Sequence, residues 1–123
     1  MTIRELYDII DGNYDQAVRV MKSEKLIDKY VRKLKNSHLD DMMEEAYGTM
    51  DAARLFESAH AMKGVCSNLG LDALARAADE ITEEFRPGNP RRLSDEEALI
   101  KLRATVERYR AAVAGIEQYE AGC

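Results

Sequence analysis

Apolar residues recur three and four positions apart along most of the chain, and this spacing constrains the fold more than any other feature of the sequence. Residues at these intervals share one face of an α-helix, so each such segment carries an apolar stripe that must be buried. The stripe is clearest in two sets, Leu26, Ile27, Tyr30, Val31 and Leu34, and Leu55, Ala59, Met62, Cys66 and Leu69. Both prolines lie in one loop-like segment, residues 86–90. The pattern predicts an all-α fold.

Capping motifs predict where the first and last helices begin. Thr2-Ile-Arg-Glu5 and Ser94-Asp-Glu-Glu97 both have the spacing of a capping box, in which two side chains and two backbone N–H groups bond reciprocally. The first box predicts a short helix that ends near Gly12, and the second predicts a long helix that ends near Tyr119. A brief helical turn is expected from about Asp15.

Polar residues ahead of apolar runs predict the internal helix starts, because their side chains accept hydrogen bonds from the first free N–H groups of a helix. We expect Ser23, Ser37 and Asp72 to be N-caps of this kind. The helices expected between these signals span residues 24–35, 37–45, 50–67 and 72–85.

Length and connection lengths predict how these helices are arranged. A chain of 123 residues is long enough for one well-formed core. Short connections between long helices favour antiparallel neighbours. We therefore expect a single domain over residues 1–123, built as an up-and-down antiparallel four-helix bundle with additional short N-terminal helices.

Charge and composition exclude several classes of partner. The net charge of −5 argues against nucleic acid, because phosphate binding requires clustered Lys and Arg. No segment approaches the 18 or more apolar residues of a membrane span, and the N-terminus does not resemble a secretory signal. Cys66 falls on an apolar stripe and Cys123 is the last residue, so we expect reduced thiols and a cytoplasmic protein.

His60 is the most informative single residue. It lies roughly 140° from the centre of the apolar stripe of its helix, so it is expected to face solvent. Lys63 and Gly64 share its face, because residues three and four apart are neighbours on a helix. A glycine inside a helix costs roughly 1 kcal/mol relative to alanine, which indicates that something must approach closely there. A nucleophile, a cation and a gap therefore lie together.

The motif His60-Ala-Met-Lys63-Gly64, followed by Asn68-Leu-Gly70-Leu71, resembles the histidine-containing phosphotransfer (HPt) domain, whose usual pattern is H-x-L-K-G. The resemblance is specific over about residues 50–85 and looser over the N-terminal half. Met62 replaces the usual leucine at similar volume. Many members place a polar amide or acid near the histidine on the next helix, and the corresponding residue here is Thr82.

The resemblance implies that His60 accepts a phosphoryl group from an aspartate of a receiver domain and passes it to another receiver. Lys63 would stabilise the negative charge and Gly64 would admit the partner, with Glu57, Ser67 and Asn68 as candidate supporting residues. The resemblance places Mg²⁺ on the receiver partner only, so no cofactor is expected here. The chain has no glycine-rich nucleotide-binding loop, so we expect a carrier rather than an enzyme with kinase activity.

Two alternatives stay open at this point. Glu57 and His60 have the Glu-x-x-His spacing of di-iron bundles, but a second such pair is missing, so no metal site is expected. The other alternative is a helical docking module that binds receiver-like partners without accepting phosphate. His38 is expected to be an ordinary exposed residue without a functional role.

Partner contacts are predicted around the histidine. Ile3, Leu6 and Ile10 of the first helix are expected to form an exposed apolar docking patch. The expected partners are receiver domains of response regulators and a hybrid sensor kinase. A monomer is expected, and the start at Met1 favours a freestanding carrier over a segment of a larger kinase.

Overall fold

The computed structural model describes residues 1–122, and every regular element within them is an α-helix. The seven helices are α1 (Ile3–Ile9), α2 (Tyr14–Met21), α3 (Glu24–Lys35), α4 (Leu39–Gly48), α5 (Ala52–Asn68), α6 (Asp72–Phe85) and α7 (Asp95–Ala121). The prediction of an all-α fold is confirmed. None of these helices combines the length and the apolar character that crossing a membrane requires.

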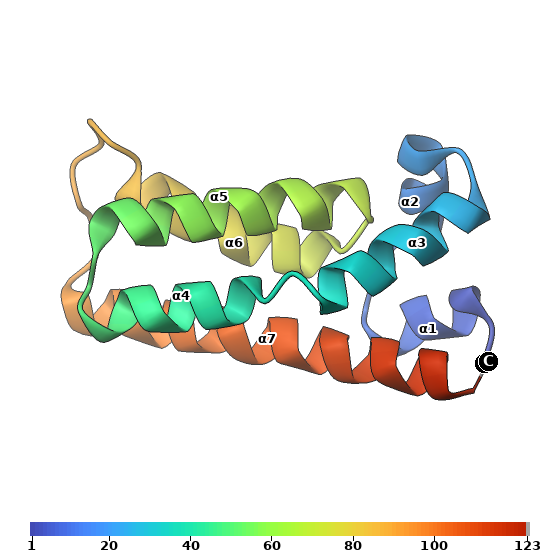
Figure 1. The fold of residues 1–123 in the computed structure, drawn as a ribbon. Coiled ribbons are helices and arrows are strands. Elements are labelled where there is room, and N and C mark those ends of the chain that lie inside the picture. The colour runs from blue at the N-terminus through green and yellow to red at the C-terminus, as the bar shows by residue number, and fades with distance from the viewer. Residues whose placement is uncertain (123) are drawn as a thin grey trace.

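Four helices, α4 to α7, form an up-and-down antiparallel bundle (Figure 1). α5 packs against α4 and α6, and α7 completes the ring by packing against the same two helices. α3 precedes α4 in nearly the same direction, after a break at residues 36–38, so that the long α7 contacts both (Figure 1). The predicted bundle with additional short N-terminal helices is therefore confirmed.

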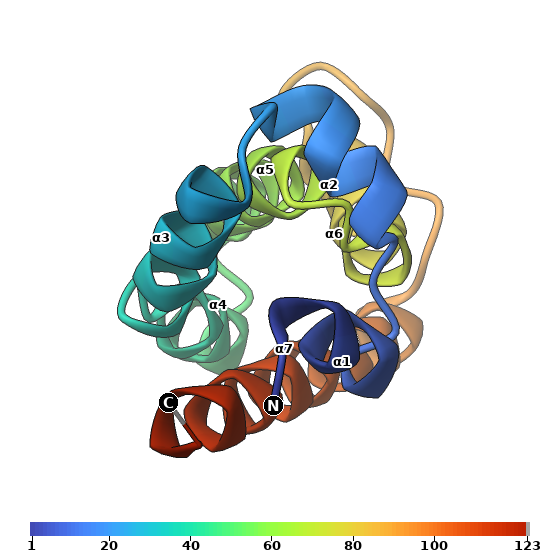
Figure 2. The same ribbon diagram turned by 90° about the vertical axis from the view of Figure 1, so that its right-hand side faces the viewer.

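The two short helices α1 and α2 cover one end of the bundle (Figure 2). α1 packs against α7, and α2 packs against α3 and α5. The hydroxyl of Tyr7 donates to the carbonyl oxygen of Leu69 at 2.6 Å, and the N–H of Asn13 donates to the carbonyl oxygen of Gly70 at 2.7 Å. A Cβ at Gly70, whose φ is +68°, would collide with the carbonyl oxygen of Asn13. The C-terminal end of α5 is thus fixed by the N-terminal segment.

The predicted exposed patch of Ile3, Leu6 and Ile10 is wrong, because α1 turns these residues toward the bundle. Ile3 and Leu6 are only 3% and 0% exposed, and Ile10 is half-buried against the core. A methyl group at Gly115 of α7 would lie 2.5 Å from Cγ2 of Ile10. The absence of a side chain at Gly115 therefore lets α1 approach α7 closely, and this approach buries the apolar face of α1.

The predicted N-caps are partly confirmed. Thr2, Ser23 and Ser94 each accept a backbone N–H as expected, and both capping boxes are complete. Asn13 caps α2, so the expected brief turn is a full helix.

Two predicted N-caps are wrong. The hydroxyl of Ser37 donates back to the carbonyl oxygen of Lys33 at 2.7 Å, and His38 takes the cap position of α4 with a left-handed φ of 55°. Asp72 is the first residue of α6, after Leu71 at the cap position. Its carboxylate accepts instead from the side-chain amide of Asn13 at 3.4 Å.

Candidate functional site

His60 lies near the middle of α5 on its exposed face, as the periodicity predicts. Asp51 begins this helix by accepting the N–H of Arg54 at 3.3 Å. On the opposite face Leu55, Ala59, Met62 and Cys66 are fully buried. Burial raises the pKa of the Cys66 thiol to about 12, so this cysteine is held as a thiol inside the core. Cys123, the other expected free thiol, lies outside the described residues.

An aromatic ring supports the imidazole of His60. Phe56, one turn earlier on α5, stacks on it with ring centroids 5.5 Å apart and planes only 12° from parallel. The guanidinium carbon of Arg86 lies 5.3 Å from the centroid of the Phe56 ring. Glu83 accepts two hydrogen bonds from Arg86, at 2.8 and 3.3 Å, and so fixes it in place. The orientation of His60 is therefore stabilised by packing rather than by a hydrogen-bonding side chain.

Lys63 is half-buried and forms an ion pair with α6. Its Nζ lies 2.7 Å from Oδ1 of Asp79, and both side chains are partly exposed. The pKa of Glu83, one turn further along α6, is lowered chiefly by its hydrogen bonds from Arg86, with the charge of Lys63 adding to the effect. Lys63, Asp79, Glu83 and Arg86 thus form a connected charged group beside the histidine face.

The residue expected near His60 on the next helix lies elsewhere. Thr82 is fully buried, and its hydroxyl donates to the carbonyl oxygen of Ala78 at 2.8 Å. Asp79, three residues earlier, is the polar group of α6 that reaches the α5 site. Sequence reasoning missed both Asp79 and Phe56. The position of Phe56 four residues before His60 was the available signal for the stack, whereas nothing local pairs Asp79 with Lys63.

Gly64 leaves an opening beside the imidazole. It is exposed, and a Cβ built on it would meet no atom within 4 Å. Packing within the domain therefore does not require glycine at this position, unlike Gly70 and Gly115. Because glycine also weakens a helix interior, the gap is explained best by an approaching partner.

The candidate supporting residues Glu57, Ser67 and Asn68 are all exposed. Within residues 1–122, no hydrogen bond joins any of them to His60. The backbone carbonyl of Ser67 accepts from the N–H of Gly70 at 3.2 Å, as part of the helix end. The structure therefore brings them to the exposed side of α5 without direct contact to the imidazole.

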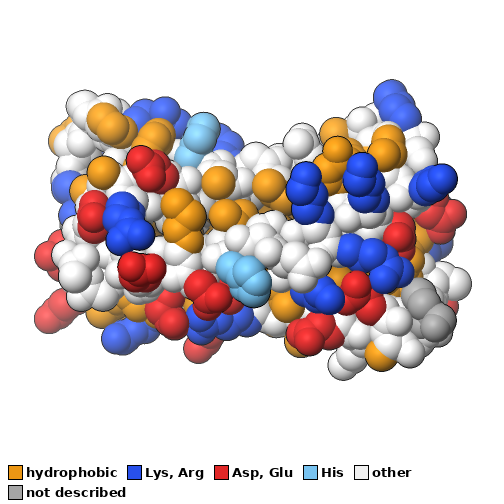
Figure 3. Space-filling model, in the orientation of Figure 1, with side chains coloured by type: hydrophobic (Ala, Val, Ile, Leu, Met, Phe, Trp, Pro, Cys, Tyr) orange, Lys and Arg blue, Asp and Glu red, His pale blue; other side chains and the backbone are white. Residues whose placement is uncertain are grey.

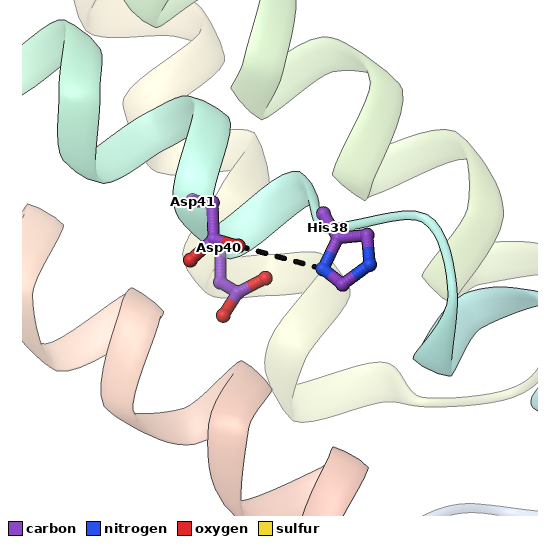
Figure 4. Close-up of side chains that lie close together, drawn as sticks. All are labelled: His38, Asp40 and Asp41. Carbon is purple, nitrogen blue, oxygen red and sulfur yellow. Dashed lines mark ion pairs between the residues drawn. The ribbon is translucent and has the colours of Figure 1, made fainter.

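The other histidine, His38, has a different setting on the same face of the molecule (Figure 3). Its Nδ1 lies 3.4 Å from a carboxylate oxygen of Asp41, and ligand-type atoms of His38, Asp40 and Asp41 lie within 4.8 Å of one another (Figure 4). Arg110 already donates to Asp40 at 2.9 Å and to Asp41 at 3.2 Å. A built-in cation therefore neutralises these exposed carboxylates, and neither Glu57 nor His60 belongs to the group.

Comparison with known proteins identifies the family. The Hpt domain family model matches residues 24–112, which include α3 to α6, most of α7 and the whole of the His60 site. No curated protein and no solved structure matches the chain. Hpt domains carry phosphoryl groups on histidine in phosphorelays and interact with receiver domains of two-component systems. With more than two thirds of its length matched, the chain belongs to the Hpt domain family.

Proposed function

We propose that this protein is a phosphorelay carrier in which His60 accepts a phosphoryl group from the phosphorylated aspartate of one receiver domain and passes it to another. The observation that supports this most is the arrangement on α5. The exposed imidazole, the half-buried Lys63 and the open position at Gly64 share one helix face inside the matched segment. No other histidine lies within that combination.

The transfer reaction requires an accessible nitrogen lone pair. The unprotonated ring nitrogen of His60 attacks phosphorus in line, a P–N bond forms, and the P–O bond to the aspartate breaks with its electron pair leaving on the carboxylate. The reverse exchange delivers the group to a second receiver. Stacking on Phe56 restricts the ring to one orientation, which lowers the entropic cost of alignment.

Lys63 supplies the positive charge for the phosphoryl oxygens. It lies one helix turn from His60, at a spacing where side chains meet. Since its ammonium is paired with Asp79 in the resting protein, it is shared with the phosphoryl group once His60 is modified. We therefore assign Asp79 a modulating role, in which its carboxylate competes with the phosphoryl group for Lys63.

The remaining expectations follow from the carrier role. The Mg²⁺ that phosphoryl transfer needs would be held by the receiver. The protein would act without ATP and without kinase activity of its own. We place it in the cytoplasm as a monomer, where the buried, reduced Cys66 thiol is stable. Its partners would be response-regulator receivers and the receiver of a hybrid sensor kinase.

A phosphotransfer assay tests the proposal. A panel of receiver domains is phosphorylated with labelled phosphate and mixed with wild-type protein, His60→Gln and His38→Gln. We expect acid-labile label on the wild type and on His38→Gln, and none on His60→Gln. His38 is a matched control, because it is also exposed and lies on the same face (Figure 3).

Two results would contradict the carrier role. Label that persists on His60→Gln would remove His60 as the acceptor. Receivers that bind the wild type with measurable affinity but never transfer label would instead establish the docking module.

A further inference from the structure

Exposed large apolar side chains gather at the α2–α3 end of the molecule. Val18, Val20 and Leu26 are 38%, 42% and 40% exposed. A groove of about 480 Å³ lies between α2, α3 and the C-terminal end of α5, and Val20, Met21, Leu26, Tyr30, Val65 and Asn68 are among its lining residues. This end of the molecule shows orange side chains bordered by blue ones (Figure 3). Apolar surface of this kind is typical of a contact surface.

A basic rim borders the groove in a protein that is acidic as a whole. Residues 19–35 contain seven Lys and Arg and only two acidic residues, although the chain carries a net charge of −5. Arg32 and Lys35 form ion pairs with Glu120. In contrast, five cations form no ion pair with any residue of 1–122, namely Arg19, Lys22, Lys25, Lys29 and Lys33. Their charge is available to an outside partner.

Two of these cations border the floor of the groove directly. The Nζ atoms of Lys29 and Lys33 each lie 5.7 Å from the ring centroid of Tyr30. Tyr30 and Lys33 both line the groove. An apolar segment that enters it therefore brings its flanking residues beside two ammonium groups, and carboxylates are the flanking groups that complement them.

The groove adjoins the His60 site. Val65 follows Gly64 directly on α5, and Asn68 lies one turn beyond it, so the gap at Gly64 opens toward the groove lining. A typical interface covers about 800 Å² on each partner. A receiver seated over His60 thus reaches the groove without rearrangement of either domain. Val20 and Met21 come from α2, which lies outside the residues that match the family.

We propose that this groove selects the receiver, by binding an apolar helix of the receiver domain that is flanked by Asp and Glu side chains. This inference rests on the proposed carrier function and specifies its partner. The apolar floor controls how long the complex lasts, and the five cations accelerate its formation and reject receivers with a basic surface. The chemistry at His60 is left to α5 and α6.

Binding measurements on groove variants test the apolar part. The probe is the receiver from the panel that labels His60 fastest, titrated against wild type, Val20→Asp, Leu26→Asp and Ile100→Asp. Ile100 is the matched control, since it is 69% exposed on α7 and does not line the groove. We expect each groove variant to weaken binding about tenfold or more, with the transfer rate at saturating receiver within about twofold of wild type. Ile100→Asp should bind as wild type does.

A charge-matched pair tests the basic rim without disturbing the fold. Lys29→Gln/Lys33→Gln and Arg103→Gln/Arg108→Gln remove two exposed cations each, and neither Arg103 nor Arg108 forms an ion pair within residues 1–122. We expect only the Lys29/Lys33 variant to slow association, by about three- to tenfold at low salt, and to flatten its dependence on ionic strength. Equal effects of the two double variants would overturn the selective role of the rim.

Phosphoramidate separates failure of this inference from failure of the carrier function, because it phosphorylates an accessible histidine without any receiver. If it labels His60 and the groove variants bind the receiver as tightly as wild type, the groove inference is wrong and the carrier function stands. If His60 is labelled neither by phosphoramidate nor by any receiver, the carrier function itself fails. Groove variants that change only self-association on size-exclusion chromatography would assign the groove to a second copy of the chain and overturn the inference.

Discussion

The two histidines of this protein are both exposed and lie on the same face, yet their surroundings differ in charge and in shape. His60 stacks on Phe56 and shares its helix face with a lysine and an open glycine position. His38 lies at a helix start beside Asp40 and Asp41. A phosphoryl group approaching His38 meets carboxylates, whereas at His60 it meets an ammonium group and a gap. Exposure alone therefore does not make a histidine a phosphoryl acceptor; the neighbouring charge and free space do.

The largest effect that sharpens this comparison is expected from Lys63→Gln. Loss of a charged hydrogen bond to the phosphoryl oxygens is worth about 1.5–3 kcal/mol, which corresponds to transfer roughly 10- to 100-fold slower. The transfer rate is measured at saturating receiver by rapid quench. Lys101→Gln is the matched control, because Lys101 also pairs with a carboxylate of α6, with Nζ 2.9 Å from Oε2 of Glu80. Equal slowing in both variants would mean that stability, not charge at the site, controls the rate.

The second effect concerns free space, and Gly64→Leu removes it. We expect transfer from a receiver to fall about tenfold or more through weaker docking, while labelling by phosphoramidate changes little. Gly48→Leu is the control, since Gly48 is also an exposed helical glycine with no atom within 4 Å of a built Cβ. Gly64→Ala should raise the free energy of unfolding by about 0.5–1 kcal/mol, measured by denaturant titration. A decrease in stability would show that the fold needs this glycine.

Much of the His60 site was predictable because it depends on one helix. The wheel argument needs only the spacing within α5, so the exposure of His60 and its shared face with Lys63 and Gly64 follow from local sequence. Asp79 and Arg86 join the site only through the way α6 and the following loop lie against α5. Such pairings are tertiary, and no local pattern encodes them.

The bundle was predictable from capping boxes and apolar stripes, whereas the N-terminal end was not. α1 has seven residues, too few for periodicity to distinguish a buried face from an exposed one. Its burial depends on Gly115, more than one hundred residues away in sequence. The apolar surface expected on α1 is found on α2 and α3 instead, where the groove lies. His38 was missed as an N-cap because non-glycine residues rarely adopt a left-handed conformation.

A smaller effect is expected from Asp79→Asn, which frees Lys63 from its ion pair. Exposed ion pairs are worth about 0.2–1 kcal/mol, so the equilibrium should shift toward phosphorylated His60 by about 1.5- to 5-fold. The measurement is the distribution of label between receiver and carrier at equilibrium. The shift must vanish in a Lys63→Gln background, because the carboxylate acts through the lysine. A shift that survives there would show that Asp79 repels the phosphoryl group directly.

The smallest effect belongs to the carboxylates around Arg110, near His38. Arg110 donates to Glu44 at 3.0 Å as well as to Asp40, and its hydrogen bond is the main cause that lowers the pKa of Glu44 below the ordinary value of 4.5. Because the folded state holds this proton less tightly than the unfolded state, the contribution to stability is complete above pH 4.5 and is lost as the pH falls through the lowered pKa.

Arg110→Gln should therefore melt slightly below wild type at neutral pH, and the difference in Tm should shrink on acidification below about pH 4.5. Thermal melts between pH 3 and pH 7 measure it. Arg103→Gln removes the same charge from α7 without losing an ion pair within residues 1–122, so its Tm difference should not follow this profile. A constant difference for Arg110→Gln down to pH 3 would show that packing of the guanidinium, rather than the carboxylates, stabilises this region. Transfer through His60 should be unaffected at every pH where the protein is folded, because this charged cluster faces His38 and not the acceptor.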